Sequence, residues 1–396
     1  MSPSPTRAVL ERPGFRRLTR AWLAINAADA ALFLMLAAWT KDLTGSDPAA
    51  AGVLVALGVP ALFAPALGQI ADRMSRVRLM VITCALSVPV LFSLALVDGP
   101  GKVWLIYLVT FLYGCVGYLV GTAQSGLVRD LLADDELAAG NGLLSTIDMA
   151  LRLVSPAIGT GLYVWLGPLA VVFLSVIGFA VGGFLLHGME IQESPPAQKV
   201  PGEWWREMTA GFRQLWANPV LRRLTILLGV AFGAIGMVNS TVFPAMEKGF
   251  QVEPATLGVF ISLQGVGSVL GGVTAARVIR VLGEPRAVGL GMAATGIGFF
   301  PLAGTSLALG VVGLLVMGLG IPWIIVGYTT IRQRLTPPEL QGRTSAAANL
   351  LLNAPQTGVL AISAGLLAVI DYRLLVLATV LVVLLSAMPL RNAEPV

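Results

Sequence analysis

Two acidic side chains and one basic side chain lie well inside the long apolar segments of this chain. Asp29 falls in the segment 18–40, whereas Asp148 and Arg152 fall in the segment 140–164. A charged side chain at the centre of a bilayer costs about 2.5–3.5 kcal/mol on insertion scales, so it faces a cavity, a partner or both. Asp29 has no basic neighbour in its own segment, and we expect it to exchange a proton near neutral pH, the alternative being a static hydrogen-bonded acid. We expect all three residues to act as one proton-coupling set.

The segment 140–164 places its polar side chains on one helical stripe. Successive members of the stripe are 4, 3, 4 and 3 residues apart, a spacing that keeps side chains on one face of a helix. Asp148 and Arg152 can therefore pair at positions i and i+4. The pair either only orients its helix or takes part in proton or substrate coupling, and the sequence leaves both open. The stripe consists of Asn141, Ser145, Asp148, Arg152 and Ser155.

Uncharged polar and aromatic side chains recur on the other apolar segments, and together they predict a shared aqueous cavity. Such side chains could instead bond one helix to another, at about 0.6 kcal/mol each on average. A cavity that is mostly apolar with a few polar groups suits an amphiphilic small molecule. The candidate cavity residues are Asn26, Phe33, Tyr113, Gln124, Ser145, Gln264, Asn349, Asn353 and Gln356.

Composition is that of an integral membrane protein. Hydrophobic residues make up 56% of the 396 positions and charged residues only 12%, against roughly half and about a quarter in soluble proteins. A bilayer core about 30 Å thick requires about 20 helical residues per crossing. Twelve apolar segments meet that length, which predicts an all-α membrane protein with twelve transmembrane helices. They cover approximately 18–40, 49–70, 79–97, 103–126, 140–164, 169–188, 222–245, 255–276, 286–304, 307–329, 345–368 and 373–390.

The basic residues lie mostly on one side of these segments. Of the 26 Lys and Arg residues, 21 fall in stretches that are cytoplasmic when both termini are placed in the cytoplasm. This asymmetry sets the orientation by the positive-inside rule. It also removes the need for a nucleic-acid partner, despite the net charge of +5.

Residues that could serve an enzyme or a metal site are scarce. The chain has one His and two Cys, and it contains neither H-E-x-x-H nor G-x-S-x-G. We expect Cys84 and Cys115 to pack inside helices rather than to form a disulfide. The sequence therefore argues against an enzyme and against a bound metal.

Three short patterns recur at a nearly constant spacing of about half the chain. Transporter folds often carry such internal repeats. We therefore expect two pseudo-symmetric six-helix bundles, at 1–190 and 218–396, joined by a cytoplasmic linker at 191–217. The matching stretches are Phe15–Thr19 with Leu221–Thr225 at a shift of 206, Gly68, Arg73 and Arg76 with Gly272, Arg277 and Arg280 at a shift of 204, and Arg129–Leu137 with Arg332–Leu340 at a shift of 203.

A charged loop at 68–78, Gly-Gln-Ile-Ala-Asp-Arg-Met-Ser-Arg-Val-Arg, separates the second and third apolar segments. It resembles the loop between helices 2 and 3 of the major facilitator superfamily, whose pattern is roughly G-x-L-A-D-R-x-G-R-R. The resemblance covers essentially the whole chain and implies transport by alternating access between two bundles. Only the first half keeps the acid, because Asp72 aligns with Ala276, so we interpret the loop as a one-sided conformational latch. The latch residues are Gly68, Asp72, Arg73 and Arg76, with Arg343 at the start of helix 11 as the expected partner.

Within the superfamily the chain is most similar to the macrolide-efflux and siderophore-exporter branch, through the stretches 15–18, 137–143 and 218–223. This resemblance implies a proton-coupled exporter of amphiphilic drugs or secondary metabolites. Such a protein uses the proton gradient and no cofactor, and we expect a functional monomer in the bacterial inner membrane. Bacterial lysophospholipid transporters show a run like Ala64–Asp72, which leaves lipid open as an alternative substrate. A channel or a receptor is the remaining alternative, although neither would require the repeated charged loops.

Overall fold

The chain folds into two compact units, each described here by itself. The computed structural model describes residues 5–194, 209–252, 257–367 and 369–391, and within these ranges the side chains of Asp29, Phe33 and Ser155 lie outside the described set. Unit 1 comprises Met1–Asp134, Val154–Gln214 and Thr336–Ala347. Unit 2 comprises Asp135–Leu153, Leu215–Leu335 and Ala348–Val396.

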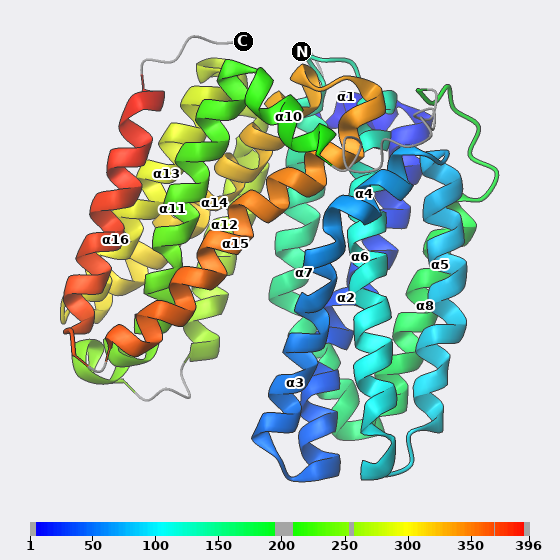
Figure 1. Cartoon of the computed structure of the whole chain (residues 1–396), viewed down its shortest axis with the longest axis horizontal. Coiled ribbons are helices and arrows are strands. Elements are labelled where there is room, and N and C mark those ends of the chain that lie inside the picture. Colours follow the sequence, from blue (N-terminus) through cyan, green and yellow to red (C-terminus); the bar gives the residue numbers. More distant parts are fainter. Residues whose placement is uncertain (1–4, 195–208, 253–256, 368, 392–396) are drawn as a thin grey trace. The chain divides into compact units, whose positions relative to one another are not determined.

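Each of the twelve predicted apolar segments corresponds to one helix or to a pair of helices (Figure 1). Those of unit 1 are α2 (Pro13–Thr44), α3 (Asp47–Gly58) with α4 (Ala64–Asp72), α5 (Arg76–Phe92), α6 (Val103–Leu131) and α8 (Pro168–Leu186). Those of unit 2 are α11 (Pro219–Pro244), α12 (Leu257–Leu282), α13 (Glu284–Phe299), α14 (Leu307–Leu335) and α16 (Tyr372–Ala387). Two more helices, α7 (Leu137–Leu166) and α15 (Gln341–Leu366), contribute to both units.

The division of α7 and α15 departs from the simple halves 1–190 and 218–396. The start of α7 belongs to unit 2, and the start of α15 belongs to unit 1. Each unit therefore includes the first turns of a helix from the other half of the sequence. The predicted linker also includes a short helix, α10 (Ala210–Ala217), whereas its two adjacent tryptophans, Trp204 and Trp205, lie outside the described residues.

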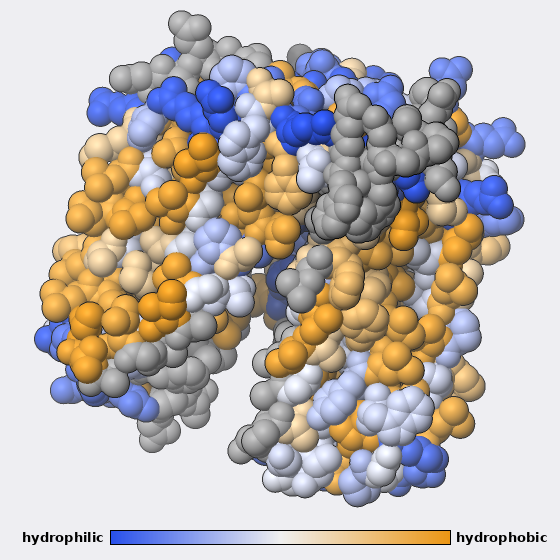
Figure 2. All heavy atoms as spheres, viewed as in Figure 1, coloured by the Kyte–Doolittle hydropathy of each residue, from blue (hydrophilic) through white to orange (hydrophobic). Residues whose placement is uncertain are grey.

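Helix length and apolar surface agree with a membrane protein. Among the described residues, eight helices are long and apolar enough to cross a bilayer, or nine when the bent pair α3 and α4 counts as one span. Apolar side chains dominate the sides of both units in Figure 2, while hydrophilic ones gather toward the helix ends. This distribution is expected where lipid replaces water around the middle of a helix.

Polar residues just before α11 and α5 cap the first turns of these helices. Asn218 precedes Pro219, and its side-chain oxygen accepts hydrogen bonds from the N–H groups of Val220 and Leu221 at 3.0 and 3.2 Å. Ser75 caps α5 in the same way, because its hydroxyl accepts from the N–H of Arg78 at 3.2 Å. Such caps satisfy backbone donors that have no partner within the helix.

Glycines bring the helices of unit 2 into backbone contact. A Cβ on Gly318 of α14 would overlap the carbonyl oxygen of Gln264 on α12, and a Cβ on Gly267 would overlap the carbonyl oxygen of Leu315. Small residues at such crossings are the usual means of tight helix packing in a membrane. This packing fixes the position of Gln264, one of the predicted cavity residues.

Candidate functional site

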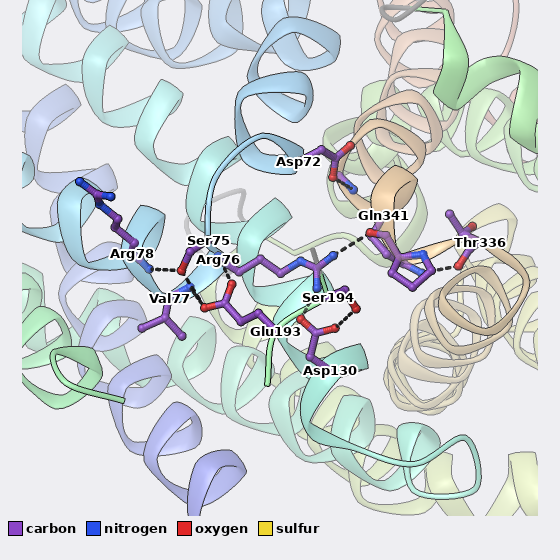
Figure 3. A network of polar contacts seen from close by, with 12 residues as sticks. Asp72, Ser75, Arg76, Val77, Arg78, Asp130, Glu193, Ser194, Thr336 and Gln341 are labelled. Carbon is purple, nitrogen blue, oxygen red and sulfur yellow. Dashed lines mark hydrogen bonds and ion pairs between the residues drawn. The ribbon is translucent and has the colours of Figure 1, made fainter. Parts of the chain in front are cut away.

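The loop between α4 and α5 binds the start of α15 through a buried carboxylate (Figure 3). Asp72, the last residue of α4, accepts hydrogen bonds from the backbone N–H groups of Gly342 at 2.7 Å and Arg343 at 2.9 Å. Its Oδ2 also lies 3.6 Å from Nε of Arg343. The first N–H groups of a helix carry partial positive charge, so the carboxylate caps α15. Asp72 and Arg343, predicted as latch partners, are thus in contact within unit 1.

Two glycines permit this close approach. A Cβ on Gly68 would lie 2.9 Å from the carbonyl oxygen of Gly342, and a Cβ on Gly342 would overlap the carboxylate of Asp72. Larger residues at either position would push α4 away from α15. Gly68, predicted for the latch, therefore allows α4 to approach the backbone of α15 because it has no side chain.

Arg76, the first residue of α5, lies at the centre of the network in Figure 3. Its guanidinium forms an ion pair with Asp130 near the end of α6, and the two side chains are only 8% and 3% exposed. The same guanidinium donates to the carbonyl oxygen of Pro338 at 2.7 Å. Arg73, the fourth predicted latch residue, follows α4 and donates its N–H to the carbonyl of Ile70 at 3.2 Å. The loop therefore bridges α6 and the segment that leads into α15.

Sequence reasoning missed Glu193, which lies after α8 at the beginning of the predicted linker. Its carboxylate accepts from the hydroxyl of Ser75 at 2.7 Å, from the N–H of Val77 at 3.3 Å and from the N–H of Arg76. The next residue, Ser194, donates its hydroxyl to Asp130 at 2.6 Å. The first residues of the predicted linker thus bond the charged loop, because Glu193 caps the first turn of α5.

We expect Asp72→Asn to loosen the start of α15 while leaving the core of unit 1 intact. The amide keeps one acceptor oxygen but loses the charge, and a hydrogen bond to a charged group contributes about 1.5–3 kcal/mol. Thr344 follows Arg343 and is 0% exposed. When Thr344 is replaced by cysteine in a variant that lacks Cys84 and Cys115, the alkylation rate of this cysteine measures how often the start of α15 opens. The rate of Thr344→Cys alkylation should rise about tenfold, as 1.4 kcal/mol implies.

Asp98→Asn is the matched control for this measurement. Asp98 is an exposed acid that pairs with Lys102 at 2.6 Å in a different loop, and such surface pairs contribute about 0–1 kcal/mol. Its removal should leave the alkylation rate unchanged. Equal rates for the Asp72→Asn variant and this control would mean that the carboxylate does not hold α15.

The start of α7 is also held by polar contacts, but with a different helix of unit 2. Asn141, at the start of α7, donates its side-chain amide to Thr330 at 3.1 Å and to Gln333 at 2.7 Å, both on α14. The position that aligns with Asp72 is Ala276. Asn141 therefore bonds the start of α7 to α14 within unit 2, whereas in unit 1 a carboxylate of α4 binds the start of α15.

The predicted proton-coupling residues are divided between the units. Asp29 lies on α2 in unit 1, with its side chain outside the described set. Asp148 and Arg152 lie on the part of α7 that belongs to unit 2, where Asp148 is half-buried and Arg152 is exposed. Their coupling stays a prediction from the sequence.

The predicted cavity residues of unit 1 have different surroundings. Asn26 donates to the carbonyl of Trp22 in its own helix at 3.0 Å, and Gln124 is half-buried on α6. Tyr113 is buried and packs edge-on against Phe179, with ring centroids 6.2 Å apart. Its hydroxyl has no hydrogen-bond partner among the described residues. The side chain of Phe33 lies outside the described set.

In unit 2 the predicted cavity residues have three different surroundings. Asn349 and Asn353 lie on an exposed face of α15, where Asn353 donates to the carbonyl of Asn349 at 2.8 Å. Ser145 is buried on α7, and its hydroxyl has no partner in the part of the chain that the structure describes. Gln264 and Gln356, in contrast, line one cavity.

This cavity of about 430 Å³ lies within unit 2, among α11, α12, α13, α14 and α15. Most of its lining is aliphatic or aromatic, and its polar members are Asn239, Gln264, Thr295 and Gln356. The Thr295 hydroxyl donates to the carbonyl of Gly291 at 2.9 Å, so the three amides are the groups available to a ligand. No charged residue is among the lining residues, which makes the cavity suited to an uncharged group with hydrogen-bonding atoms.

A sequence profile described as Major Facilitator Superfamily matches residues 21–357. Relatives include the class E tetracycline resistance protein of Escherichia coli, 25% identical over 64% of this chain and 62% of that protein. Macrolide efflux protein A of Streptococcus pyogenes is 26% identical over 72% of this chain and 71% of that protein. The lysophospholipid transporter LplT of an Enterobacter species is 25% identical over 63% of this chain and 62% of its own length.

The matches do not reach the full length of these proteins. An uncharacterized MFS-type transporter, y4rN, of Sinorhizobium fredii is 28% identical over 55% of this chain and 54% of its own length. The chain therefore spans between about half and two thirds of the length of this relative and of the tetracycline resistance protein.

Two solved structures share the arrangement of helices. A bacterial homologue of the iron transporter ferroportin, in an outward-facing state, has a TM-score of 0.76 at 18% identity, over 95% of this chain and 98% of that chain. The human organic anion transporter MFSD10 has a TM-score of 0.76 at 16% identity, over 98% and 100%. The predicted all-α fold of twelve membrane helices is confirmed by these likenesses. Together with the profile match, they establish that the chain belongs to the major facilitator superfamily of membrane transporters.

Proposed function

We propose that the protein is a proton-coupled exporter of amphiphilic small molecules. The observation that carries the proposal is the apolar cavity of unit 2 with its three amides. Its 430 Å³ falls within the range of about 300–1,000 Å³ that is typical of small-molecule sites. An apolar body with a few hydrogen-bonding groups matches this lining, and drugs of the kind named by the tetracycline and macrolide relatives have that character.

The two shared helices supply the mechanical part of the proposal. Alternating access requires one bundle to move against the other around a substrate site. Because α15 begins in unit 1 and continues in unit 2, releasing its first turn from Asp72 would free the helix to move with unit 2. The latch would thus set which state is favoured, without contacting substrate.

Asp29 would bind the coupled proton, and Asp148 and Arg152 would adjust the proton affinity of Asp29. We place the protein in a bacterial inner membrane with both termini in the cytoplasm, because the basic residues gather on that side. A monomer suffices, since one chain supplies both units. Protonation from outside would then lower the affinity for substrate and permit its release.

A lysophospholipid is the alternative substrate. The relative LplT and the shared run Ala64–Asp72 support it. A lysolipid has one apolar chain and a large polar headgroup, whereas a drug presents several polar atoms around an apolar body. The amides of the cavity favour the drug-like ligand, because three of them converge on one volume.

We expect Gln264→Leu to weaken ligand binding about tenfold, because a ligand atom buried without its hydrogen-bond partner loses about 1–3 kcal/mol. Titration of the purified protein with tetracycline, erythromycin and a lysophospholipid, followed by thermal shift, measures the effect. Thr357→Leu is the control, since Thr357 is an exposed polar residue of α15 that does not line this cavity. A ligand that binds both variants equally would place the substrate site elsewhere, and stabilisation by lysophospholipid alone would favour the lipid alternative.

A further inference from the structure

A second hollow of unit 2 lies on its outer face rather than among its helices. It is a groove of about 450 Å³ bordered by α11, α15 and α16. Its lining is apolar apart from Thr225, whose hydroxyl already bonds the hydroxyl of Tyr328 at 2.7 Å. Ile226 and Val230 project into it and are 47% and 50% exposed. The groove is therefore an open apolar surface and is separate from the cavity assigned to substrate.

Glycines form the floor of the groove. A Cβ on Gly229 would lie 3.2 Å from the carbonyl oxygen of Leu351, and a Cβ on Gly233 would lie 3.3 Å from Cβ of Pro355. The two helices consequently touch at the backbone, and no side chain of α11 fills the space above these positions. The groove therefore passes over two positions of α11 that carry no side chain.

One end of the groove is cationic and aromatic. On α11 the lining residues Ile226, Gly229, Gly233 and Met237 are spaced by 3 or 4 residues and share one face. Arg222 lies four residues before Ile226 on the same face and is exposed. Trp216 borders the groove at this end and is 43% exposed, in keeping with the preference of Trp for the membrane interface.

The length of the groove matches a single leaflet. At a rise of 1.5 Å per residue, the stretch from Ile226 to Met237 is about 17 Å long. Half of a hydrocarbon core of about 30 Å is about 15 Å. A ligand that fills the groove from the Arg222 end would therefore reach the middle of the bilayer and no further.

We propose that this groove binds one anionic phospholipid, with an acyl chain along α11 and the headgroup phosphate at Arg222. An acyl chain fits an apolar groove that is as long as one leaflet is thick. The guanidinium of Arg222 can pair with the negatively charged headgroup at the interface. A transmembrane helix from a second copy fits less well, because it would follow a stripe through both leaflets. The groove instead ends at mid-membrane on one side and at a cation on the other.

The test uses native mass spectrometry of the purified protein with an equal mixture of phosphatidylglycerol and phosphatidylcholine carrying the same 16-carbon chains. We expect one retained phosphatidylglycerol, preferred about fivefold, the effect of one basic residue at an anionic leaflet. Arg222→Gln should abolish the preference and Arg222→Lys should keep it. Ile226→Trp should reduce retention of both lipids by filling the groove.

Two variants control for charge and for bulk. Arg223→Gln removes the neighbouring guanidinium, which is already bonded to the carbonyl of Pro389 at 2.8 Å, so the preference should persist. Val273→Trp adds the same bulk at a site that is 64% exposed on α12 and outside the groove. The proposal is overturned if Arg222→Gln retains the preference, if both tryptophans act alike, or if Ile226→Cys cross-links to a second copy in liposomes. The readout involves no transport, so the proposed function does not depend on it.

Discussion

Replacing Asp130 with leucine is expected to lower the free energy of unfolding by about 3–5 kcal/mol, the cost of breaking a buried ion pair by removing one partner. The side chains of Arg76 and Asp130 are 8% and 3% exposed, so water cannot take the place of the lost carboxylate. Arg76 would keep the carbonyl of Pro338, but Ser194 would lose the acceptor of its 2.6 Å hydrogen bond. Thermal and denaturant unfolding of the purified protein in detergent measures the loss.

Asp134→Leu is the control, because Asp134 is 63% exposed and pairs with Arg129 at 2.8 Å only a few residues away. A surface pair of this kind contributes about 0–1 kcal/mol. The double variant Asp130→Leu, Arg76→Met should recover much of the stability, since apolar residues often replace a buried pair without loss. The assignment fails if Asp130→Leu costs no more than Asp134→Leu, or if the double variant is the least stable of all.

The membrane helices could be predicted from sequence because their signal is local. A run of about 20 apolar residues specifies a spanning helix without reference to the rest of the chain, and each predicted segment corresponds to helix in the structure. Caps such as Asn218 with Pro219 are likewise readable within a few residues. The pairing of Asp72 with Arg343 spans 271 residues, and it was anticipated only through the resemblance of the charged loop to a known family.

Contacts that depend on how the helices pack could not be predicted from the sequence. Glu193 is 118 residues from Ser75, and an acid after an apolar segment gives no sign that it caps a distant helix. Gln264 and Gln356 were predicted for one aqueous cavity shared with polar residues of several other helices, and the sequence did not show that these two line the same cavity within unit 2. Asn239, which lines the same cavity, was missed because nothing in its local sequence distinguishes it from a helix-packing amide.

The assignment of α7 and α15 to both units also needed the structure. Sequence repeats divide the chain at the linker, since repeats report ancestry and spacing rather than contact. The contacts instead place the start of each of these helices with the opposite half. The start of α15 is bound by the carboxylate of Asp72 on α4, whereas Asn141 at the start of α7 bonds residues of α14, so the two contacts are built from different helices.

Asp29→Asn is expected to abolish efflux driven by a pH gradient, with the initial rate at least about 100-fold lower than that of the wild type. Asparagine has nearly the same size and can still form hydrogen bonds, but it cannot bind and release a proton. If the proton taken up at Asp29 drives substrate release, then substrate binding should persist while the coupled step is lost. Purified protein in liposomes with an imposed gradient gives the rate, and thermal shift with the same substrate gives the binding.

Neighbouring variants separate proton coupling from helix structure. Thr19→Val, on the same helix, removes a buried hydroxyl that donates to the carbonyl of Phe15 at 2.8 Å, so its efflux should stay within about twofold of the wild type. Asp148→Asn alone should impair efflux under either interpretation of the pair with Arg152. Combined with Arg152→Gln, it should restore efflux if the pair merely orients α7, and it should stay inactive if Asp148 takes part in coupling. Unchanged gradient-driven efflux by Asp29→Asn would remove Asp29 from the proton path, because a side chain that cannot titrate cannot carry the coupled proton.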